Sequence, residues 1–310
     1  MRFAIFGTGG VGGYFGGKLA QVGEDVTFIA RGKNLESLKN SGLRVDSILG
    51  DFVLEKVQAT DLPHSLKNID VILLATKTWQ LDSAIIEMKP MLGEQTAILP
   101  LLNGMEHVDT LRAEFGGHVL GGLCRISSFL IAPAHVSHVA VNPHIEFNEW
   151  KQETSPRVGE VLSVFSKIKE ITVDTPPDIE LAMWEKYLLI CAFSGVGAIT
   201  RQPVGVFRSD PESRAMFIRS LHEVVAVARA RGVNLTEKSA ESVLARIDQT
   251  QPDMMASMQK DVMEGRPSEL EAQIGALVRM ANAANIPVPT NEFIYSTLLP
   301  LEQKARSKAA

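Results

Sequence analysis

The sequence has few of the features that mark a disulfide-stabilised, secreted or membrane-spanning protein. Its 310 residues include two cysteines, Cys124 and Cys191, which lie far apart in apolar sequence without a CxxC spacing. We therefore expect two buried, reduced thiols and no metal site. The first residues, Met1 to Phe6, lack the separate apolar stretch and cleavage site of a signal peptide. No apolar run approaches the roughly 18 to 20 residues that span a bilayer, so we predict a cytoplasmic protein.

An excess of charge of one sign is also lacking. The net charge is -5 and the isoelectric point is near 5.9, which gives no general attraction to nucleic acids or anionic membranes. No basic stripe with interleaved aromatic residues is present. We therefore predict no nucleic-acid partner and no membrane partner. With 45% hydrophobic residues, the chain is long enough for about two domains, each with its own core.

The first half of the chain is typical of an α/β domain. Short β-branched runs alternate there with helical stretches, as a parallel sheet requires. The clearest strands are expected at Phe3–Phe6, Val26–Ala30, Val71–Ala75 and Ala97–Leu101. Three further strands, Val119–Ser127, Val136–Val141 and His144–Phe147, are expected to extend this sheet.

The second half has the pattern of an all-helical domain. Long amphipathic or apolar stretches, punctuated by Pro and Gly, begin after about residue 175, and the boundary is expected near Thr175–Pro177. The members of one apolar stripe at helical spacing, expected in the core, are Phe217, Ile218, Leu221, Val224, Val225 and Ala228. Gly232 is expected to end that helix. We predict a Rossmann-type domain over residues 1–174 and a helical domain over residues 175–310.

A glycine-rich segment follows the first strand directly and precedes a helix expected over Tyr14–Val22. In a dinucleotide-binding turn, Gly7 permits the tight bend, Gly9 lets the backbone approach a pyrophosphate, and Gly12 allows close packing of helix on strand. The helix N-terminus then offers N–H groups to the phosphates. The residues expected at the cofactor are Gly7, Thr8, Gly9, Gly10, Val11 and Gly12.

The end of the second strand favours NADP(H) over NAD(H). An NAD enzyme usually has Asp or Glu there, which binds the ribose hydroxyls. This chain has Arg31, with Lys33 two residues later, so a 2'-phosphate would meet cations. The alternative is that Arg31 is a solvated loop charge.

Several separated segments together resemble the ketopantoate reductase (2-dehydropantoate 2-reductase) family. They are the glycine loop with Arg31, the segment 75–80 (ATKTWQ), the segment 102–105 (LNGM), the segment 183–186 (MWEK), and the pair Ser257 and Glu269. The resemblance spans nearly the whole chain, in the same order. It implies that the protein reduces the 2-keto group of ketopantoate with NADPH to give pantoate, in a cleft closed by the helical domain. It also implies a homodimer formed through that domain.

The resemblance assigns roles to three residues of this chain. Lys186 matches the catalytic acid, which would stabilise and protonate the carbonyl oxygen after hydride reaches C2. Asn103 matches an asparagine between nicotinamide and substrate, and Lys77 a lysine near the nicotinamide ribose and substrate. Two alternatives stay open: Lys186 could be a packed lysine that reaches water, and Asn103 with Gly104 could be an ordinary turn.

Two residues of the C-terminal half complete the match. Ser257 matches a serine that contacts the substrate, and Glu269 a glutamate in the cofactor and substrate region. The sequence offers a second account of Glu269, because Ser268 and Glu271 have the spacing of a capping box. In that case Glu269 would favour the first turn of a helix through its charge.

The chain departs from the family where the substrate pocket is expected. The family usually has asparagines four and eight residues after the catalytic lysine and one in the next loop, where this chain has Ile190, Ser194 and Val204. Ser194 keeps a hydroxyl at the substrate, but the other two cannot bond a substrate polar group, and each lost contact costs roughly 1 to 3 kcal/mol. We hypothesise that Arg201 holds the substrate carboxylate; the alternative is a surface arginine.

Three functions compete on these observations. The first is the reduction of ketopantoate itself. The second is the NADPH-dependent reduction of a different 2-keto acid, which the departures at the pocket favour. The third is a non-catalytic NADP-binding sensor, which would be expected to lose Lys186 or Asn103 while it keeps the glycine loop.

Overall fold

The computed structural model describes residues 1–150 and 155–309, which form two compact units. The α/β unit contains residues 1–102 and 107–179, and the helical unit contains residues 103–106 and 180–310. The chain therefore passes into the helical unit after Ile179, compared with the predicted boundary after residue 174. The short segment Asn103–Glu106 also belongs to the helical unit, although it follows a strand of the α/β unit.

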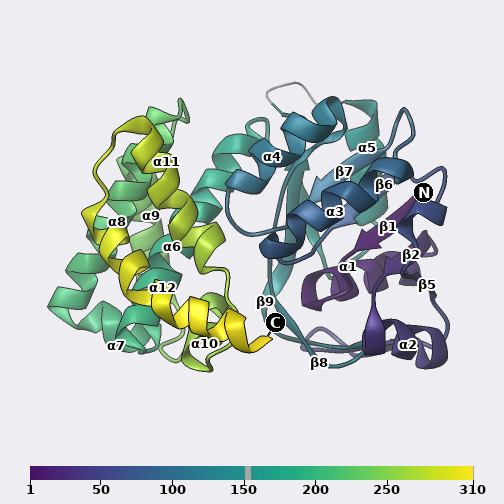
Figure 1. The fold of residues 1–310 in the computed structure, drawn as a ribbon, viewed down its shortest axis with the longest axis horizontal. Coiled ribbons are helices and arrows are strands. Elements are labelled where there is room, and N and C mark those ends of the chain that lie inside the picture. The colour runs from purple at the N-terminus through teal and green to yellow at the C-terminus, as the bar shows by residue number, and fades with distance from the viewer. Residues whose placement is uncertain (151–154, 310) are drawn as a thin grey trace. The chain divides into compact units, whose positions relative to one another are not determined.

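A parallel five-stranded sheet forms the centre of the α/β unit (Figure 1). Its strands stand in the order β5-β2-β1-β6-β7. Their bounds are Arg2–Phe6 (β1), Asp25–Ile29 (β2), Gln58–Thr60 (β5), Val71–Leu74 (β6) and Ala97–Pro100 (β7). The four strands predicted for this sheet are confirmed, apart from single residues at their ends. The strand order reverses between β1 and β6, which is where open α/β sheets bind ligands at the carboxyl ends of the strands.

A hydrophobic core lies on each face of this sheet. Successive side chains of a strand point to opposite faces, so one strand contributes to both cores. Phe3 and Ile5 of β1 join one hydrophobic core, and Ala4 and Phe6 join another. The helices of the first half are α1 (Gly10–Gln21), α2 (Gly32–Ser41), α3 (Leu81–Met88), α4 (Glu106–Phe115) and α5 (Pro156–Phe165). The first helix thus begins four residues before the predicted Tyr14. Single 3-10 turns lie at Pro63–Ser65, Thr78–Gln80, Lys89–Met91 and Gly116–His118.

The later strands of this unit pair in a second sheet, so the prediction that they extend the first is wrong apart from one parallel bridge between Val119 and Ile98 of β7. The order is β10-β9-β3-β4, and β8 pairs with β9. The bounds are Leu43–Ser47 (β3), Phe52–Leu54 (β4), Gly121–Ala132 (β8), His135–Asn148 (β9) and Thr172–Asp174 (β10). Strands β8 and β9 make a long antiparallel hairpin with register shifts. The two strands predicted at Val136–Val141 and His144–Phe147 are parts of β9, which pairs with β3 rather than with the central sheet.

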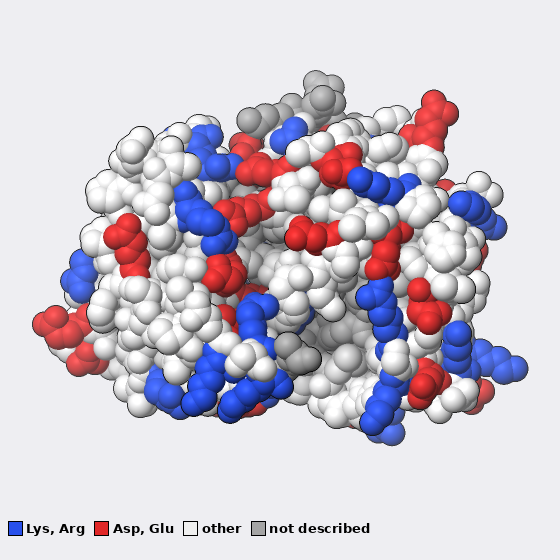
Figure 2. Space-filling model, viewed as in Figure 1, with Lys and Arg blue, Asp and Glu red and all other residues white. Residues whose placement is uncertain are grey.

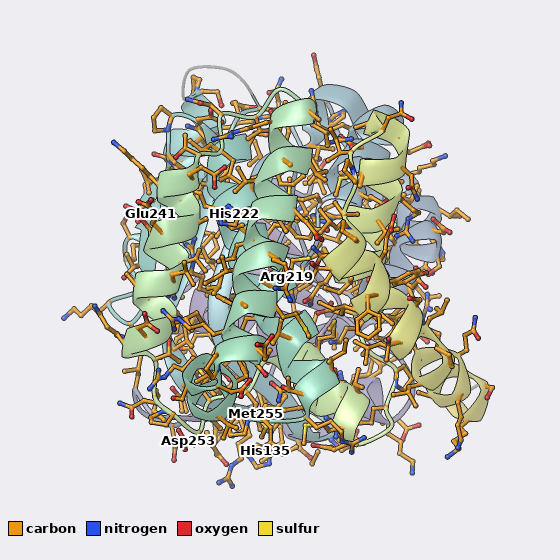
Figure 3. All side chains as sticks on the ribbon, turned by 90° about the vertical axis from the view of Figure 1, so that its left-hand side faces the viewer. His135, Arg219, His222, Glu241, Asp253 and Met255 are labelled. Atoms are coloured by element: carbon orange, nitrogen blue, oxygen red, sulfur yellow. The ribbon has the colours of Figure 1, made fainter. Side chains whose placement is uncertain are left out.

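The helical unit confirms the prediction for the second half. Its elements are α6 (Ile179–Thr200), α7 (Val204–Ser209), α8 (Pro211–Ala230), α9 (Glu237–Gln249), α10 (Ser257–Met263), a π-helical turn (Glu271–Gly275), α11 (Ala276–Ala284) and α12 (Pro289–Ala309). The predicted stripe on α8 is buried except for the half-buried Ile218, and Gly232 follows that helix with φ +84°. Figure 3 shows the opposite, exposed side of α8, which carries Arg219 and His222.

One helix, α6, is long and apolar enough to meet the length and composition criteria of a membrane span, with mean hydropathy 1.2. However, 72% of that stretch is buried inside the protein, as in the core helix of a globular domain. On the visible face of the α/β unit, Lys and Arg side chains are interspersed with Asp and Glu, and neither sign dominates (Figure 2).

Candidate active site

The turn between β1 and α1 requires glycine at its first and last positions. Gly7 has φ +98°, and a Cβ atom there would lie 2.7 Å from the backbone nitrogen of Thr76. A Cβ atom at Gly12 would lie 2.1 Å from the carbonyl oxygen of Gly7. Both contacts are with backbone, which cannot move aside cheaply, so the tight turn and the close packing of α1 on β1 depend on these glycines.

The two middle glycines differ from each other. A Cβ atom at Gly10 would lie 2.3 Å from the carbonyl oxygen of Ser128, so β8 packs directly against the turn. A Cβ atom at Gly9 would have no heavy atom within 4 Å. Packing within the protein therefore does not require a glycine at position 9. The missing side chain leaves open space beside the N-terminus of α1, where the backbone of a dinucleotide-binding turn approaches phosphate.

Buried polar atoms on both sides of this turn have no hydrogen-bond partner among the described residues. They are Oγ1 of Thr76, which follows β6, and Oγ of Ser128 on β8. Buried hydroxyls are normally hydrogen-bonded, so both atoms are suited to receive a ligand group or an ordered water. Together with the space at Gly9, they show that this turn fits a bound dinucleotide.

Side-chain hydrogen bonds hold the glycine turn against the end of β2 and the start of α2. Thr8 Oγ1 donates to the carbonyl oxygen of Ile29 at the end of β2 (3.1 Å). Asn34 Nδ2 donates to the carbonyl oxygen of Thr8 (2.9 Å), and Asn34 Oδ1 accepts from the backbone N–H of Ala134 (2.7 Å). Val11 is half-buried against the adjoining core. Asn34 has no motif of its own, and sequence reasoning missed it.

The two predicted cofactor cations lie at the same sheet edge as the glycine turn. Arg31 is the N-cap of α2 after β2, and Lys77 follows β6, so they end the strands on either side of β1. Lys77 is exposed, with Nζ 5.7 Å from the centre of the Trp79 ring. Arg31 is also exposed, and its Nη2 forms an ion pair with Oε1 of Glu87 on α3. Glu87 was not predicted as a partner of Arg31, because no residue pattern connects the two positions.

A second cluster lies in the helical unit and includes Asn103. Asn103 Nδ2 donates a hydrogen bond to Glu269 Oε2 (2.9 Å). The next residue, Gly104, has φ +95°, and a Cβ atom there would lie 2.4 Å from the carbonyl oxygen of Ala272. The segment that carries Asn103 therefore packs closely on the π-helical turn after Glu269.

A charged network holds the same two segments together. Arg279 on α11 donates to Glu106 (Nη2–Oε2 2.7 Å) and to Glu271 (Nη1–Oε2 2.8 Å). The hydrogen bond to Glu106 is the largest cause that holds the pKa of Arg279 above its usual value. Tyr295 on α12 donates to Glu271 Oε1 (2.9 Å), and burial is the main cause that raises the pKa of this tyrosine.

The capping predicted for Ser268 and Glu271 is formed in part: Ser268 Oγ accepts from the backbone N–H of Leu270 (3.3 Å), whereas the backbone N–H of Ser268 bonds another carboxylate. The backbone N–H of Ser268 donates to the buried carboxylate of Glu302, with N–O distances of 3.0 and 3.1 Å. Glu271 is bound by Arg279 and Tyr295 instead. Glu269 is 5% exposed and bonds Asn103, and its carbonyl oxygen accepts from the backbone N–H of Gln273, so it lies at the start of a helix as well as in this cluster.

Lys186 lies in the middle of the first half of α6 and is 9% exposed. Its neighbour Tyr187 packs edge-on against the Trp184 ring and donates a hydrogen bond to the carbonyl oxygen of Gln273. Burial raises the pKa of Tyr187 well above its usual value, so the hydroxyl remains a donor. Gln273 in turn donates its backbone N–H to the carbonyl oxygen of Glu269 (3.0 Å). These bonds join the helix that carries Lys186 to the segment that begins at Glu269.

The positions four and eight residues beyond Lys186 share its side of α6, as helical geometry requires. They are Ile190, which is half-buried, and Ser194, which is 3% exposed and makes no hydrogen bond within the described residues. Val204 at the start of α7 is fully buried. This side of α6 is therefore mainly apolar. Cys191 on the same helix is a buried thiol whose pKa is raised by burial. Cys124 is also buried, as predicted, and its thiol donates to the carbonyl oxygen of Leu101 (3.8 Å).

Two predicted substrate residues stand apart from these contacts. Ser257 is the first residue of α10 and is exposed, and Arg201 follows α6, exposed, with φ +56°. Neither side chain forms a hydrogen bond or ion pair within the described residues. Among those residues, no group of three or more His, Cys, Asp or Glu side chains is arranged to hold a metal ion.

The chain matches one protein family over almost its whole length. Residues 3–152 match the family described as ketopantoate reductase PanE/ApbA, and residues 178–302 match its C-terminal domain. The chain is 32% identical to the uncharacterized oxidoreductase YkpB of Bacillus subtilis, over 96% of this chain and 98% of that protein. It is 26% identical to the 2-dehydropantoate 2-reductase of a Nostoc species, over 99% and 97%. The structure of a PanE/ApbA family ketopantoate reductase from Ralstonia eutropha has 30% identity and a TM-score of 0.89, with 99% of this chain and 100% of that chain covered. With its Rossmann-type α/β unit and helical C-terminal unit, the chain belongs to the ketopantoate reductase family, which consists of oxidoreductases that act on keto acids.

Proposed function

We propose that this protein reduces the 2-keto group of ketopantoate to give pantoate, with NADPH as the hydride donor. The observation that carries the proposal is the joining of Asn103, Glu269 and the helix of Lys186 by hydrogen bonds within one unit. All three residues match functional positions of the family. The joining of their segments supports the catalytic interpretation over the packed lysine and the ordinary turn.

The cofactor site is proposed at the carboxyl edge of the parallel sheet. The open position at Gly9 and the N-terminus of α1 would hold the pyrophosphate. Arg31 would bind the 2'-phosphate, which favours NADPH, and Lys77 would lie towards the nicotinamide ribose. The bound nicotinamide supplies a hydride to C2 of the keto acid.

Lys186 is the proposed proton donor. As the hydride adds to C2, the carbonyl π electrons move to oxygen, and the Lys186 ammonium stabilises and then protonates that oxygen. Glu269 accepts from Asn103 Nδ2, which fixes the plane of the Asn103 amide and leaves its oxygen and second hydrogen available to cofactor and substrate. Ser194 and Ser257 are the proposed polar contacts of the substrate, and Arg201 of its carboxylate.

One observation favours a second candidate, the reduction of a 2-keto acid with an apolar tail. Ile190 and Val204 replace family asparagines, and the side of α6 beyond Lys186 offers only the hydroxyl of Ser194. A substrate hydroxyl left without a partner there would cost roughly 1 to 3 kcal/mol.

The experiment that separates these candidates is NADPH oxidation by the purified protein with ketopantoate and with a panel of other 2-keto acids, beside an NADH series. Rapid, NADPH-selective turnover of ketopantoate supports the first candidate. Turnover of another keto acid, without turnover of ketopantoate, replaces it with the second. NADPH binding without turnover of any keto acid overturns both.

We also infer a cytoplasmic homodimer formed through the helical unit, on the strength of the family resemblance. Sedimentation analysis of the purified protein tests the dimer. A monomer at micromolar concentration contradicts it without affecting the proposed reaction.

A further inference from the structure

The ion pair between Arg31 and Glu87 lies at the proposed 2'-phosphate site. Arg31 stands at the end of β2, and its side chain is 63% exposed, whereas the side chain of Glu87 on α3 is 25% exposed. Glu87 Oε1 accepts from Arg31 Nη2, and Glu87 Oε2 is buried without a hydrogen-bond partner among the described residues. Among the described residues, the carboxylate of Glu87 therefore has one hydrogen-bond donor, Arg31.

Within the described residues, Arg31 is the cation that forms an ion pair with Glu87. Lys89, the next basic residue along the chain, pairs with Glu114 through a contact of 2.5 Å. Lys33 is exposed in the first turn of α2 and forms no ion pair within the described residues. Before any cofactor binds, Arg31 is thus already paired with the carboxylate of Glu87.

A 2'-phosphate bound by Arg31 would share the guanidinium with this carboxylate. The two anions would lie on neighbouring N–H groups of one side chain and repel each other, or Glu87 would have to leave Arg31 and be solvated elsewhere. A cofactor with a free 2'-hydroxyl incurs neither cost, because a hydroxyl can donate to a carboxylate. The ion pair between Arg31 and Glu87 is therefore expected to weaken NADPH binding more than NADH binding.

We propose that Glu87 is a specificity-determining residue that narrows the preference of this site for NADPH, so that NADH is also bound. The inference rests on the proposed role of Arg31 at the 2'-phosphate. Arg31 supplies the attraction for the phosphate, and Glu87 sets how much of that attraction is available. Glu87 lies more than fifty residues beyond the strand end at which cofactor preference is usually judged from sequence.

The test is direct binding, measured by the fluorescence of NADPH and NADH on titration of the protein without keto acid. Glu87→Gln keeps the size of the side chain and removes its charge. We expect it to tighten NADPH binding by about threefold to tenfold, the scale of a partly exposed charge interaction, and to change NADH binding by less than about twofold. Asp82→Asn is the matched control, because Asp82 is an exposed acidic residue of the same helix.

The result that overturns the proposal is an unchanged ratio of NADPH to NADH affinity in Glu87→Gln. Weaker NADPH binding in that variant also overturns it, since Glu87 would then orient Arg31 for the phosphate. Arg31→Ala separates the two hypotheses. If Arg31→Ala binds NADPH as tightly as the parent protein, the proposed 2'-phosphate site is wrong. The proposal for Glu87, which acts through Arg31, is then wrong as well. If Arg31→Ala weakens NADPH binding but Glu87→Gln leaves the ratio unchanged, only the proposal for Glu87 is wrong.

Discussion

Asn103 and Glu269 stand 166 positions apart and are joined by a hydrogen bond of 2.9 Å. Asn103 follows a strand of the α/β unit in sequence, yet it belongs to the helical unit by its contacts. The bond connects an amide to a carboxylate that is 5% exposed, and charged acceptors make the stronger hydrogen bonds. An asparagine in an unconstrained turn would rotate, whereas this one has a fixed orientation.

Loss of either partner of this bond should reduce turnover, and the effects of the two losses should not be independent. We expect Asn103→Ala and Glu269→Gln each to lower kcat about tenfold or more, the order of magnitude seen for positioned groups at a reacting centre. The double variant should lose much less than the product of the two single effects, because both act through one hydrogen bond. Steady-state kinetics of the four proteins measure this coupling, and fully multiplicative effects would contradict it.

Arg279 should act on catalysis by positioning the Asn103 segment. Its bonds to Glu106 and Glu271 hold that segment on the π-helical turn, but its side chain is 47% exposed, so its contribution to stability is small. We expect Arg279→Ala to lower kcat about fivefold to tenfold with little change in melting temperature. Arg279→Lys should restore little, because it lacks the planar fork that spans two carboxylates. Arg229→Ala, which removes an exposed arginine paired with Glu237, is the control.

Lys186 should be needed for chemistry and dispensable for cofactor binding. We expect Lys186→Ala to lose at least about a hundredfold in kcat, the usual scale of general acid catalysis, while its affinity for NADPH changes little. Lys238→Ala, at an exposed lysine of α9, should behave like the parent protein. Fluorescence titration and initial rates measure the two quantities separately. Retention of most of the turnover would remove Lys186 from the mechanism.

Substitution of Gly9 should affect cofactor binding, whereas substitution of Gly12 should affect stability. Gly9→Ala adds a methyl group in open space, so we expect an unchanged melting temperature but NADPH affinity lowered about tenfold or more, because the pyrophosphate approaches there. Gly12→Ala meets the carbonyl oxygen of Gly7 at 2.1 Å and should lose stability. Gly159→Ala on α5, also free of contacts within 4 Å, is the control. Normal NADPH binding by Gly9→Ala would exclude the turn as the phosphate site.

The features that sequence reasoning found are those with local causes. The buried strands, the glycine turn and the apolar stripe of α8 follow from short-range patterns, and the structure has them within a few residues. The second sheet was misjudged because periodicity shows that a segment is a strand but not which strand it pairs with. The hairpin β8–β9 is long enough to form its own sheet with β3.

The long-range relations could not be predicted from residue patterns. Asn103, Lys186 and Glu269 were named from the family resemblance, and only the fold shows the hydrogen bonds that join their segments. Glu87 and Arg279 look like ordinary solvated charges of amphipathic helices, so no sequence signal distinguishes them. The capping box had the right spacing at Ser268, but the buried Glu302 bonds its backbone N–H instead.

Ile190 should determine whether the substrate hydroxyl is accepted. It shares the side of α6 with Lys186 and is half-buried. We expect Ile190→Asn to raise kcat/KM for ketopantoate relative to the analogue with hydrogen in place of the hydroxyl, by about tenfold for one regained hydrogen bond. Leu181→Asn places the same amide at a half-buried position nine residues earlier, on the opposite side of α6 from Ile190, and should leave the ratio unchanged. Because the two keto acids differ in one hydroxyl, the ratio cancels any general loss of activity in the variant. An unchanged ratio for Ile190→Asn would show that the tail of the substrate does not contact this side of α6, and equal gains in both variants would show that position on the helix does not matter.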